Sequence, residues 1–174
     1  MDYEEYLFVP KERIGVLIGE KGTTRNAIER YTGVKIEIDS ETGEVNLERS
    51  DKTDAVKALQ AREVVKAIAQ GFSPKKAFKL LQEDYYLRVI DLEEIVGTDR
   101  ALARQKARLI GTGGKARRFL EKATNTEISV YGKNAAVIGQ LKEVEIAAEA
   151  IARLVTGSPH GKVYRFIEKQ KEKW

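Results

Sequence analysis

The sequence predicts an α+β fold built from two copies of one β-α-α-β-β-α unit. Sliding the 174-residue sequence against itself by 92 positions gives eight identities in twenty positions, where roughly one is expected by chance. Each copy combines short apolar runs typical of strands with longer stretches of helical periodicity. A loop punctuated by glycines stands at the same place in both copies.

The identical positions surround two glycines in each copy. They are Leu17 with Leu109, Ile18 with Ile110, Gly19 with Gly111, Gly22 with Gly114, Arg25 with Arg117, Glu29 with Glu121, Thr32 with Thr124, and Ile36 with Ile128. This pattern indicates that one unit was duplicated. In the middle of the chain, the residues that most strongly favour a domain boundary are Gly, Ser and Pro within 71–74. We therefore expect a first domain over 1–72, a linker with a short helix over 73–84, a second domain over 85–156, and a basic helical tail over 157–174.

The first unit begins with an aromatic-rich strand, and Pro10 can open the helix that follows it. Thr23 is a candidate cap for the second helix, and Gly33 closes that helix. Asp51 or Thr53 starts the last helix, whose apolar stripe includes Val56 and Leu59. The expected elements are strand 3–9, helix 11–18, loop 19–22, helix 23–31, strands 34–38 and 44–48, and a helix ending near 70.

The second unit repeats this order. Its first helical stretch is longer and is broken near Gly97. The expected elements are strand 85–90, helical stretch 93–110, loop 111–114, helix 115–124, strands 128–131 and 135–138, and helix 141–154.

Each unit places a G-x-x-G loop between two helices. Glycine lets another backbone approach closely because it has no Cβ, and a loop that opens a helix presents free N–H groups to a phosphate. The two features together predict a clamp for a sugar-phosphate backbone. We expect Ile36 and Ile128, on the strand after the second helix, to give the other wall of the groove apolar contact with unstacked bases.

Three other interpretations of the second glycine cluster can be compared with the sequence. A P-loop fails because Leu109 stands at its leading glycine and Ala116 at its closing Ser/Thr. A dinucleotide fingerprint fits loosely, but the preceding segment is basic and helical rather than a buried strand. A plain helix-turn-helix with glycine caps stays open for one loop alone, and the duplicated loop favours the phosphate clamp.

Charge is distributed unevenly along the chain. Residues 1–83 carry 14 Lys/Arg and 15 Asp/Glu, whereas residues 84–174 carry 17 and 12. Within 100–122 there are eight basic residues and one acid, Glu121. A stripe of one sign suggests a polyanionic partner, since a solvated helix face normally alternates in sign.

Composition excludes several other classes of protein. There is no cysteine, so disulfides and thiolate metal sites are excluded. No apolar run is long enough to span a membrane, and the acidic N-terminus lacks a targeting core, so we expect a cytoplasmic protein. The single histidine, His160, lies in a segment, SPHG, that is typical of a turn, and we expect it to be a solvated loop residue. Neither a catalytic constellation nor a metal-ligand spacing is present, and we expect no enzymatic activity and no cofactor.

The segment IGVLIGEKGTTRNAIERYTGVKIEI resembles the KH signature, and LIGTGGKARRFLEKATNTEISV is its second copy. The opening VPKERIGVLIG and the GKxR after the second loop resemble one subgroup. This is the archaeal version of the small-subunit ribosome-assembly proteins of the partner-of-Nob type, related to the Krr processome protein. The resemblance covers nearly the whole chain.

The resemblance implies type I KH domains, each a three-stranded antiparallel sheet with helices on one face, that bind single-stranded RNA. It also implies a role in maturation of small-subunit rRNA and partnership with the PIN-domain nuclease that trims the rRNA 3′ end. The candidate RNA-binding residues are Gly19, Glu20, Lys21, Gly22, Arg25, Ile36, Arg104, Arg108, Gly111, Thr112, Gly113, Gly114, Lys115, Arg117, Arg118 and Ile128.

The sequence departs from the family pattern at several positions. Arg25 and Arg117 replace an apolar residue that is common after the second loop glycine, and Glu20 in the first loop should repel phosphate. Asn125 replaces the glycine that closes the helix, a position where asparagine tolerates the left-handed conformation. Two alternatives stay open: a protein-interaction platform in which one KH unit docks a nuclease or translation factor, and an RNA-binding subunit of an RNA-degrading complex.

Overall fold

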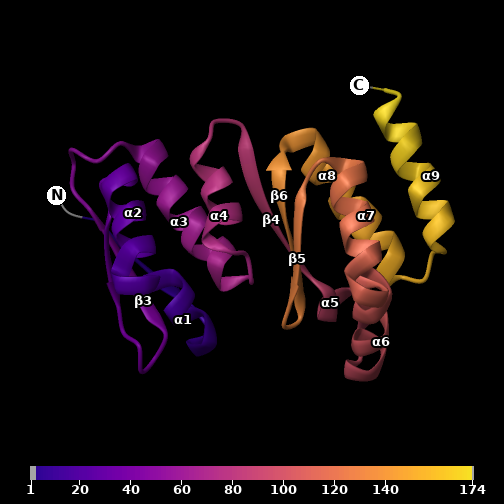
Figure 1. The fold of residues 1–174 in the computed structure, drawn as a ribbon, viewed down its shortest axis with the longest axis horizontal. Coiled ribbons are helices and arrows are strands. Elements are labelled where there is room, and N and C mark those ends of the chain that lie inside the picture. Colours follow the sequence, from indigo (N-terminus) through magenta and orange to yellow (C-terminus); the bar gives the residue numbers. More distant parts are fainter. Residues whose placement is uncertain (1–2, 174) are drawn as a thin grey trace. The chain divides into compact units, whose positions relative to one another are not determined.

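The chain, described over residues 3–173 by a computed structural model, divides into two compact units, Met1–Glu83 and Asp84–Trp174. Each unit contains one antiparallel three-stranded sheet in which the last strand of the unit lies in the middle. Helices accompany each sheet, as Figure 1 shows. The predicted α+β fold with a repeated β-α-α-β-β-α order is confirmed.

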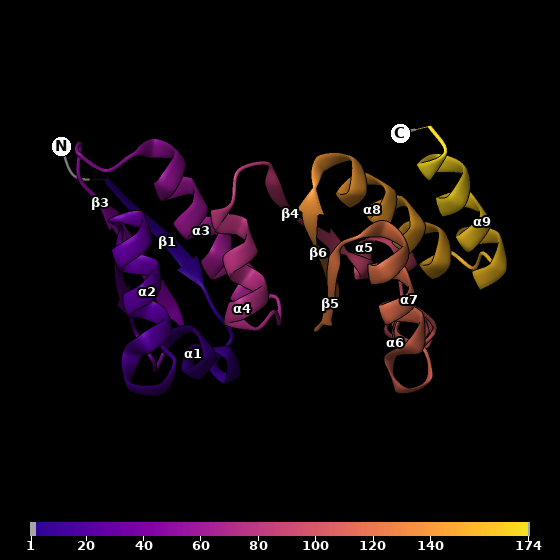
Figure 2. The ribbon, with the colours of Figure 1, turned by 45° about the horizontal axis from the view of Figure 1, so that its top comes forward.

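In the first unit, the sheet order is β1-β3-β2, and the helices lie on one face of the sheet (Figure 2). Val45, Leu47 and Ile36 alternate with polar residues along their strands and are buried against the helices, together with Leu17 and Ile28. The elements are β1 (Tyr3–Phe8), α1 (Lys11–Ile18), the 3₁₀ turn η1 (Glu20–Gly22), α2 (Thr23–Thr32), β2 (Lys35–Ile38), β3 (Glu44–Arg49), α3 (Ala55–Ala69), α4 (Pro74–Ala77) and η2 (Phe78–Leu81).

Two details of the first unit differ from the sequence prediction. The cap of α3 is Asp54, whose carboxylate accepts hydrogen bonds from the backbone of Val56 and Lys57, so neither Asp51 nor Thr53 starts this helix. Val56 and Leu59 are exposed, because the buried stripe of α3 begins only at Ala61. The first turns of the helix extend past the sheet-facing core.

The segment predicted as a linker packs onto the first unit. Ser73 caps α4 by accepting a hydrogen bond from Lys76, and Pro74 occupies the first helical turn. Ala77 and Leu80 are buried. Residues 73–83 therefore belong to the first compact unit rather than to a free connection.

The second unit has the sheet order β4-β6-β5. Gly97, in the left-handed region at φ 88°, separates two helices at the predicted break. The core gathers around Leu109, Leu120 and Ile151. The elements are β4 (Tyr85–Asp91), α5 (Leu92–Val96), α6 (Asp99–Ile110), η3 (Thr112–Gly114), α7 (Lys115–Thr124), β5 (Glu127–Tyr131), β6 (Asn134–Gln140), α8 (Leu141–Val155) and α9 (His160–Lys171).

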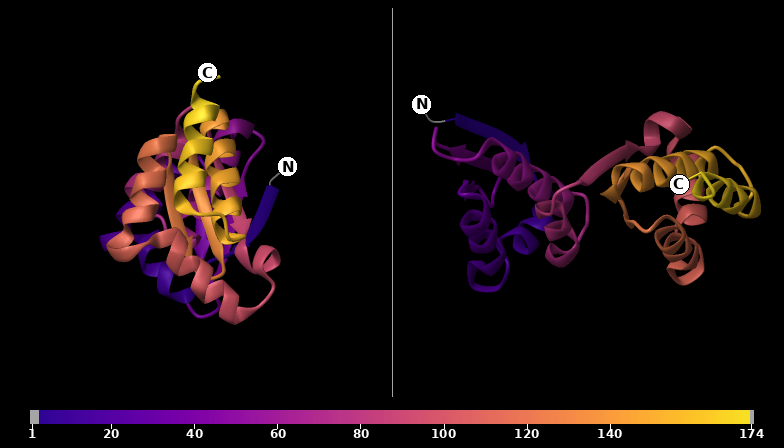
Figure 3. Two further views of the ribbon diagram at one scale, coloured as in Figure 1. Left: turned by 90° about the vertical axis from the view of Figure 1, so that its right-hand side faces the viewer. Right: turned by 90° about the horizontal axis from the view of Figure 1, so that it is seen from above.

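The C-terminal helix α9 is part of the second core. Its residues Val163 and Ile167 are completely or almost completely buried and belong to the same cluster as Leu154 of α8. Figure 3 shows α9 beside α8. The predicted basic helix therefore exists, but its apolar stripe makes it a packed element rather than a tail.

We expect Ile167→Ala to destabilise the protein by about 2–5 kcal/mol, because a fully buried isoleucine is replaced by a cavity. Urea unfolding followed by circular dichroism measures this change. The exposed residue Lys169, on the same helix, provides the control: Lys169→Ala should shift stability by less than about 0.5 kcal/mol. Equal effects of the two substitutions would show that α9 contributes nothing to the core.

Candidate nucleic-acid interface

The two G-x-x-G loops have the same backbone conformation. The φ/ψ angles are 75°/169° at Gly19 and 75°/170° at Gly111, and 77°/13° at Gly22 and 78°/14° at Gly114. The third loop residue is left-handed in both units, at φ 55° for Lys21 and φ 61° for Gly113. Duplicated sequence has thus produced duplicated geometry.

Each loop leads directly into a helix whose first turn is not capped by a side chain. Gly22 is the N-cap of α2 and Gly114 is the N-cap of α7, and neither helix end receives a side-chain hydrogen bond. Thr23, predicted as the cap, is instead the first residue of α2. The first backbone N–H groups therefore remain available to an anion, with the positive end of the helix dipole behind them.

The first and third residues of the second loop differ in the space that they leave for a side chain. A Cβ on Gly111 would lie 2.7 Å from the backbone nitrogen of Ala116, so the loop and α7 could not approach as they do. A Cβ on Gly113 would meet nothing within 4 Å, and Lys21 adopts almost the same conformation in the first unit. The bare surface at Gly113 is therefore free for close approach by a ligand.

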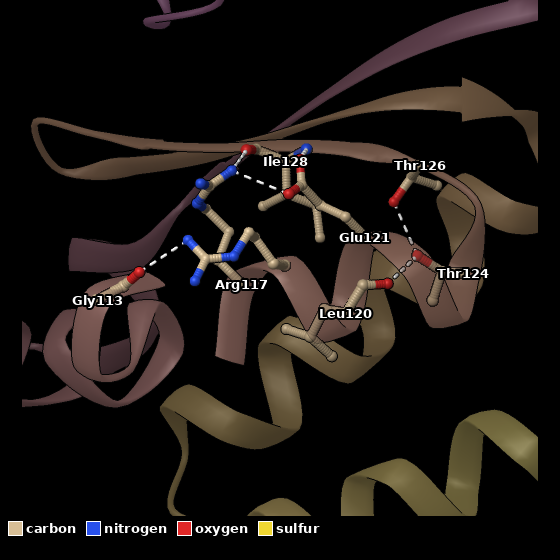
Figure 4. A network of polar contacts seen from close by, with 8 residues as sticks. Gly113, Arg117, Leu120, Glu121, Thr124, Thr126 and Ile128 are labelled. Atoms are coloured by element: carbon tan, nitrogen blue, oxygen red, sulfur yellow. Dashed lines mark hydrogen bonds and ion pairs between the residues drawn. The ribbon is translucent and has the colours of Figure 1, made fainter. Parts of the chain in front are cut away.

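Arg117 lies between the second G-x-x-G loop and β5. Its Nη1 donates to Glu121 Oε1 at 3.0 Å and to the backbone oxygen of Ile128 at 3.3 Å, which joins α7 to β5 (Figure 4). The guanidinium also lies close to Gly114. This half-buried arginine places a fixed positive charge between the loop and the strand.

Glu121 links the same helix and strand. Its Oε2 accepts the backbone N–H of Ile128 at 2.9 Å, so one carboxylate holds both Arg117 and the strand (Figure 4). In the first unit Glu29 likewise accepts the backbone N–H of the strand residue Ile36, at 2.8 Å. A short charge-assisted bond of this kind fixes the width of the space between helix and strand.

The second loop is held by a further arginine. Arg118 is exposed and its Nη1 donates to the backbone oxygen of Gly113 at 2.7 Å. Lys115, in the first turn of α7, is also exposed. The guanidinium groups of Arg117 and Arg118 therefore lie beside the loop at the N-terminus of α7, with Lys115 exposed in the same turn. Backbone N–H groups and cations in such an arrangement are suited to an anion.

The duplicated groove geometry agrees with comparisons to known proteins. The model for the eukaryotic type KH domain (KH-domain type I) matches residues 86–172, and the KH-domain model matches residues 4–70. The chain belongs to the KH-domain family. Relatives among archaeal and fungal proteins also confirm the resemblance to the partner-of-Nob subgroup.

A KH domain-containing protein of Methanocaldococcus jannaschii is 43% identical over 170 residues, covering 97% of this chain and 74% of that protein. The pre-rRNA-processing protein pno1 of Aspergillus fumigatus is 34% identical over 129 residues, covering 72% of this chain and 51% of that protein. The chain thus spans about half the length of this fungal relative.

Among solved structures, the chain is similar to one from the a/eIF2alpha–aDim2p–rRNA complex of Pyrococcus horikoshii OT3. The TM-score is 0.93 and the sequence identity is 46%. The match covers 99% of this chain and 96% of that chain.

The first KH unit differs from the second in its groove. Arg25 occupies the position of Arg117, but its buried Nε lacks a hydrogen-bond partner among the described residues. In the first loop Glu20 and Lys21 are both exposed. The first groove therefore has an arginine that is not held like Arg117 and carries an acid at the position of Thr112.

Two predicted contacts do not agree with the structure. The side chains of Ile36 and Ile128 are 3% and 2% exposed, so they belong to the core and cannot line the groove as predicted. The sequence could not reveal that these two side chains are buried. Alternation along a strand predicts which residues share a face of the sheet, but not whether helices or solvent cover that face.

Arg108 also has a structural role. Its guanidinium donates to the backbone oxygens of Leu154 and Ser158 and so caps the C-terminal end of α8. Arg13 does the same for α3 in the first unit, through Ile68 and Phe72. Arg104, by contrast, is exposed on α6 and remains a candidate. The basic stripe therefore includes cations that hold the fold together as well as exposed ones.

Glu29 and Glu121 were not among the predicted site residues. The sequence did contain a sign of their role, because the two glutamates are identical in the repeat and occupy the same position relative to the loop. Asn125 is left-handed at φ 55° and ends α7, as predicted.

We expect Gly111→Ala to destabilise the protein by several kcal/mol, because both the φ of 75° and the close approach to Ala116 oppose a side chain. Gly113→Ala should cost only about 1–2 kcal/mol, the strain of a left-handed residue without a clash. Thermal unfolding of the two variants checks the difference. Similar changes in stability would contradict the assignment of separate roles to the two glycines.

Proposed function

We propose that this chain binds single-stranded RNA through its KH units and acts in the maturation of small-subunit rRNA. The observation that carries the proposal is the second groove. There an uncapped helix N-terminus, the bare Gly113 and the guanidinium of Arg117 converge. The rRNA in the Pyrococcus horikoshii complex and the pre-rRNA-processing role in the name of the Aspergillus relative support the substrate class.

In this proposal the phosphates lie against the loop, where the first N–H groups of α7 and the side chains of Lys115 and Arg118 meet them. The bases extend from the loop toward the backbone of β5. Arg117 stands between the two walls and is tied to Glu121. The residues proposed to contact RNA in the second unit are Arg104, Gly111, Thr112, Gly113, Gly114, Lys115, Arg117 and Arg118. Their counterparts in the first unit are Gly19, Glu20, Lys21, Gly22 and Arg25.

The chain acts in this proposal as a binding protein and not as an enzyme. Within residues 3–173, no group of three or more His, Cys, Asp or Glu side chains is placed to hold a metal ion. No described helix is both long and apolar enough to cross a bilayer. Action together with a PIN-domain nuclease is supported by the family resemblance alone.

A single-stranded fragment of small-subunit rRNA should bind more tightly than the same fragment annealed to its complement, because a KH groove accepts unstacked bases. Fluorescence anisotropy with labelled RNA measures both affinities. The logarithm of the association constant should fall with the logarithm of salt concentration with a slope of about −0.7 for each phosphate contacted. Equal affinity for single strand and duplex would refute the proposal.

We expect the second KH unit to provide most of the affinity. Thr112→Asp with Gly113→Asp should weaken binding by ten-fold or more, about 1.4 kcal/mol, because two negative charges then stand where the phosphate lies. The salt slope should also decrease in magnitude by about 0.7 for each phosphate that the variant no longer binds. Aspartate tolerates the left-handed conformation at position 113.

The first loop provides a matched control. Glu20→Asp with Lys21→Asp also leaves two aspartates, at positions of the same backbone geometry, and it removes a positive charge as well. This variant should keep most of the affinity of the parent. Both variants must melt like the parent, and an equal effect of the two loops would show that the units share the RNA equally.

A further inference from the structure

The sheet of the first unit has an open face on which three rows of side chains cross the three strands. Strand alternation places these residues opposite the buried Val45 and Leu47. From the register, the rows are Glu4–Glu48–Lys35, Tyr6–Asn46–Glu37, and Phe8–Glu44 followed by Asp39 at the end of β2. This surface, the open sheet face, lies on the side of the sheet away from the helices of the first unit.

The open sheet face is strongly acidic in a protein whose net charge is +4. Its carboxylates belong to Glu4, Glu37, Asp39, Glu44 and Glu48, and its cation is Lys35, which pairs with Glu37 at 3.2 Å. Glu4 and Glu48 are directly opposed across two strands, and like charges in that position destabilise a sheet. Glu48 has Lys35 opposite it on the other neighbouring strand and accepts a hydrogen bond from Asn46, so local contacts offset part of this repulsion.

Aromatic rings stand among these charges. Phe8 is 73% exposed and Tyr6 is 55% exposed. The Tyr6 hydroxyl donates to Glu4 at 2.9 Å, and this bond raises the pKa of Tyr6. Exposed rings next to carboxylates suit an arginine or lysine, since the ring face attracts a cation while the carboxylates accept its N–H groups.

A pocket of about 350 Å³ lies in the same face. It is lined by Tyr6, Glu37, Ile38, Asp39, Glu44 and Asn46. The side-chain oxygen of Asn46 has no hydrogen-bond donor among the described residues. The carboxylate of Asp39 accepts the backbone N–H groups of Glu41 and Thr42, which lowers its pKa and keeps it charged. The pocket thus combines three acidic side chains, one ring and a free acceptor.

We propose that the open sheet face docks an extended, Lys/Arg-rich segment of a partner protein, with one long cationic side chain entering the pocket. Charge complementarity selects this occupant. RNA would be repelled by the carboxylates, and a second copy presenting the same face would meet its own charge. The equivalent strand β6 of the second unit has Ala136 and Ile138 where β3 has Asn46 and Glu48, so the acidic face is particular to the first unit.

Binding of a labelled peptide of alternating arginine and serine, measured by fluorescence anisotropy on the full chain, tests the proposal. We expect Glu37→Gln with Glu44→Gln to weaken binding by about ten-fold or more, while affinity for single-stranded RNA is unchanged. Tyr6→Leu should weaken peptide binding several-fold without any change of charge, because the ring face is removed.

The matched control is Glu94→Gln with Glu145→Gln, two exposed acids of the second unit whose removal gives the same change in net charge. This control should bind the peptide like the parent. Equal weakening in the two double variants would show non-specific attraction and overturn the proposal. It would also be overturned by RNA crosslinks at Tyr6 or Phe8, or by a dimer in sedimentation that the Glu37/Glu44 variant abolishes. RNA affinity is measured on the same samples, so failure here is distinguishable from failure of RNA binding.

Discussion

The groove of each unit depends on one hydrogen bond between a glutamate side chain and the backbone of the facing strand. Glu121 accepts the N–H of Ile128, and Glu29 accepts the N–H of Ile36. The bond joins the helix that follows the G-x-x-G loop to the next strand of the sheet. The side chain of the same isoleucine is buried in the core. The strand is therefore held both by its backbone N–H and by its side chain. A rigid groove lowers the entropic cost of ordering a flexible single strand.

Duplication preserved this frame while the charges around it changed. The loops have the same backbone angles, yet the second loop bears Thr112 and Gly113 where the first bears Glu20 and Lys21. Arg117 is engaged by Glu121 and the strand, whereas the Nε of Arg25 lacks a partner among the described residues. The contrast extends to the sheets, since β3 presents polar and acidic residues on its open face and β6 presents apolar residues at the matching register. One fold thus supports a basic surface in the second unit and an acidic sheet face in the first.

Arginines serve structure as well as binding in this chain. Arg108 and Arg13 cap the C-terminal ends of α8 and α3 through backbone oxygens. In each case one acceptor, Leu154 or Ile68, lies in the last turn of the helix, and the other, Ser158 or Phe72, lies in the segment after it. The guanidinium, which carries five donors, therefore ties the helix end to the following loop. The dense basic stripe of the sequence therefore overstates the charge that is free to meet RNA, because part of it closes helices.

The sequence by itself determined the duplicated α+β unit, the positions of the loops and the break at Gly97, because glycine conformation and apolar periodicity are local properties. It also indicated the left-handed conformation of Asn125. Only the tertiary structure decided that Ile36 and Ile128 face the core, that Arg108 caps a helix and that α9 belongs to the second core. The role of Glu121 also needed the fold, since its partner is seven residues away on another element. Such contacts depend on which layers meet in space, and the pattern along one strand or helix does not contain that information.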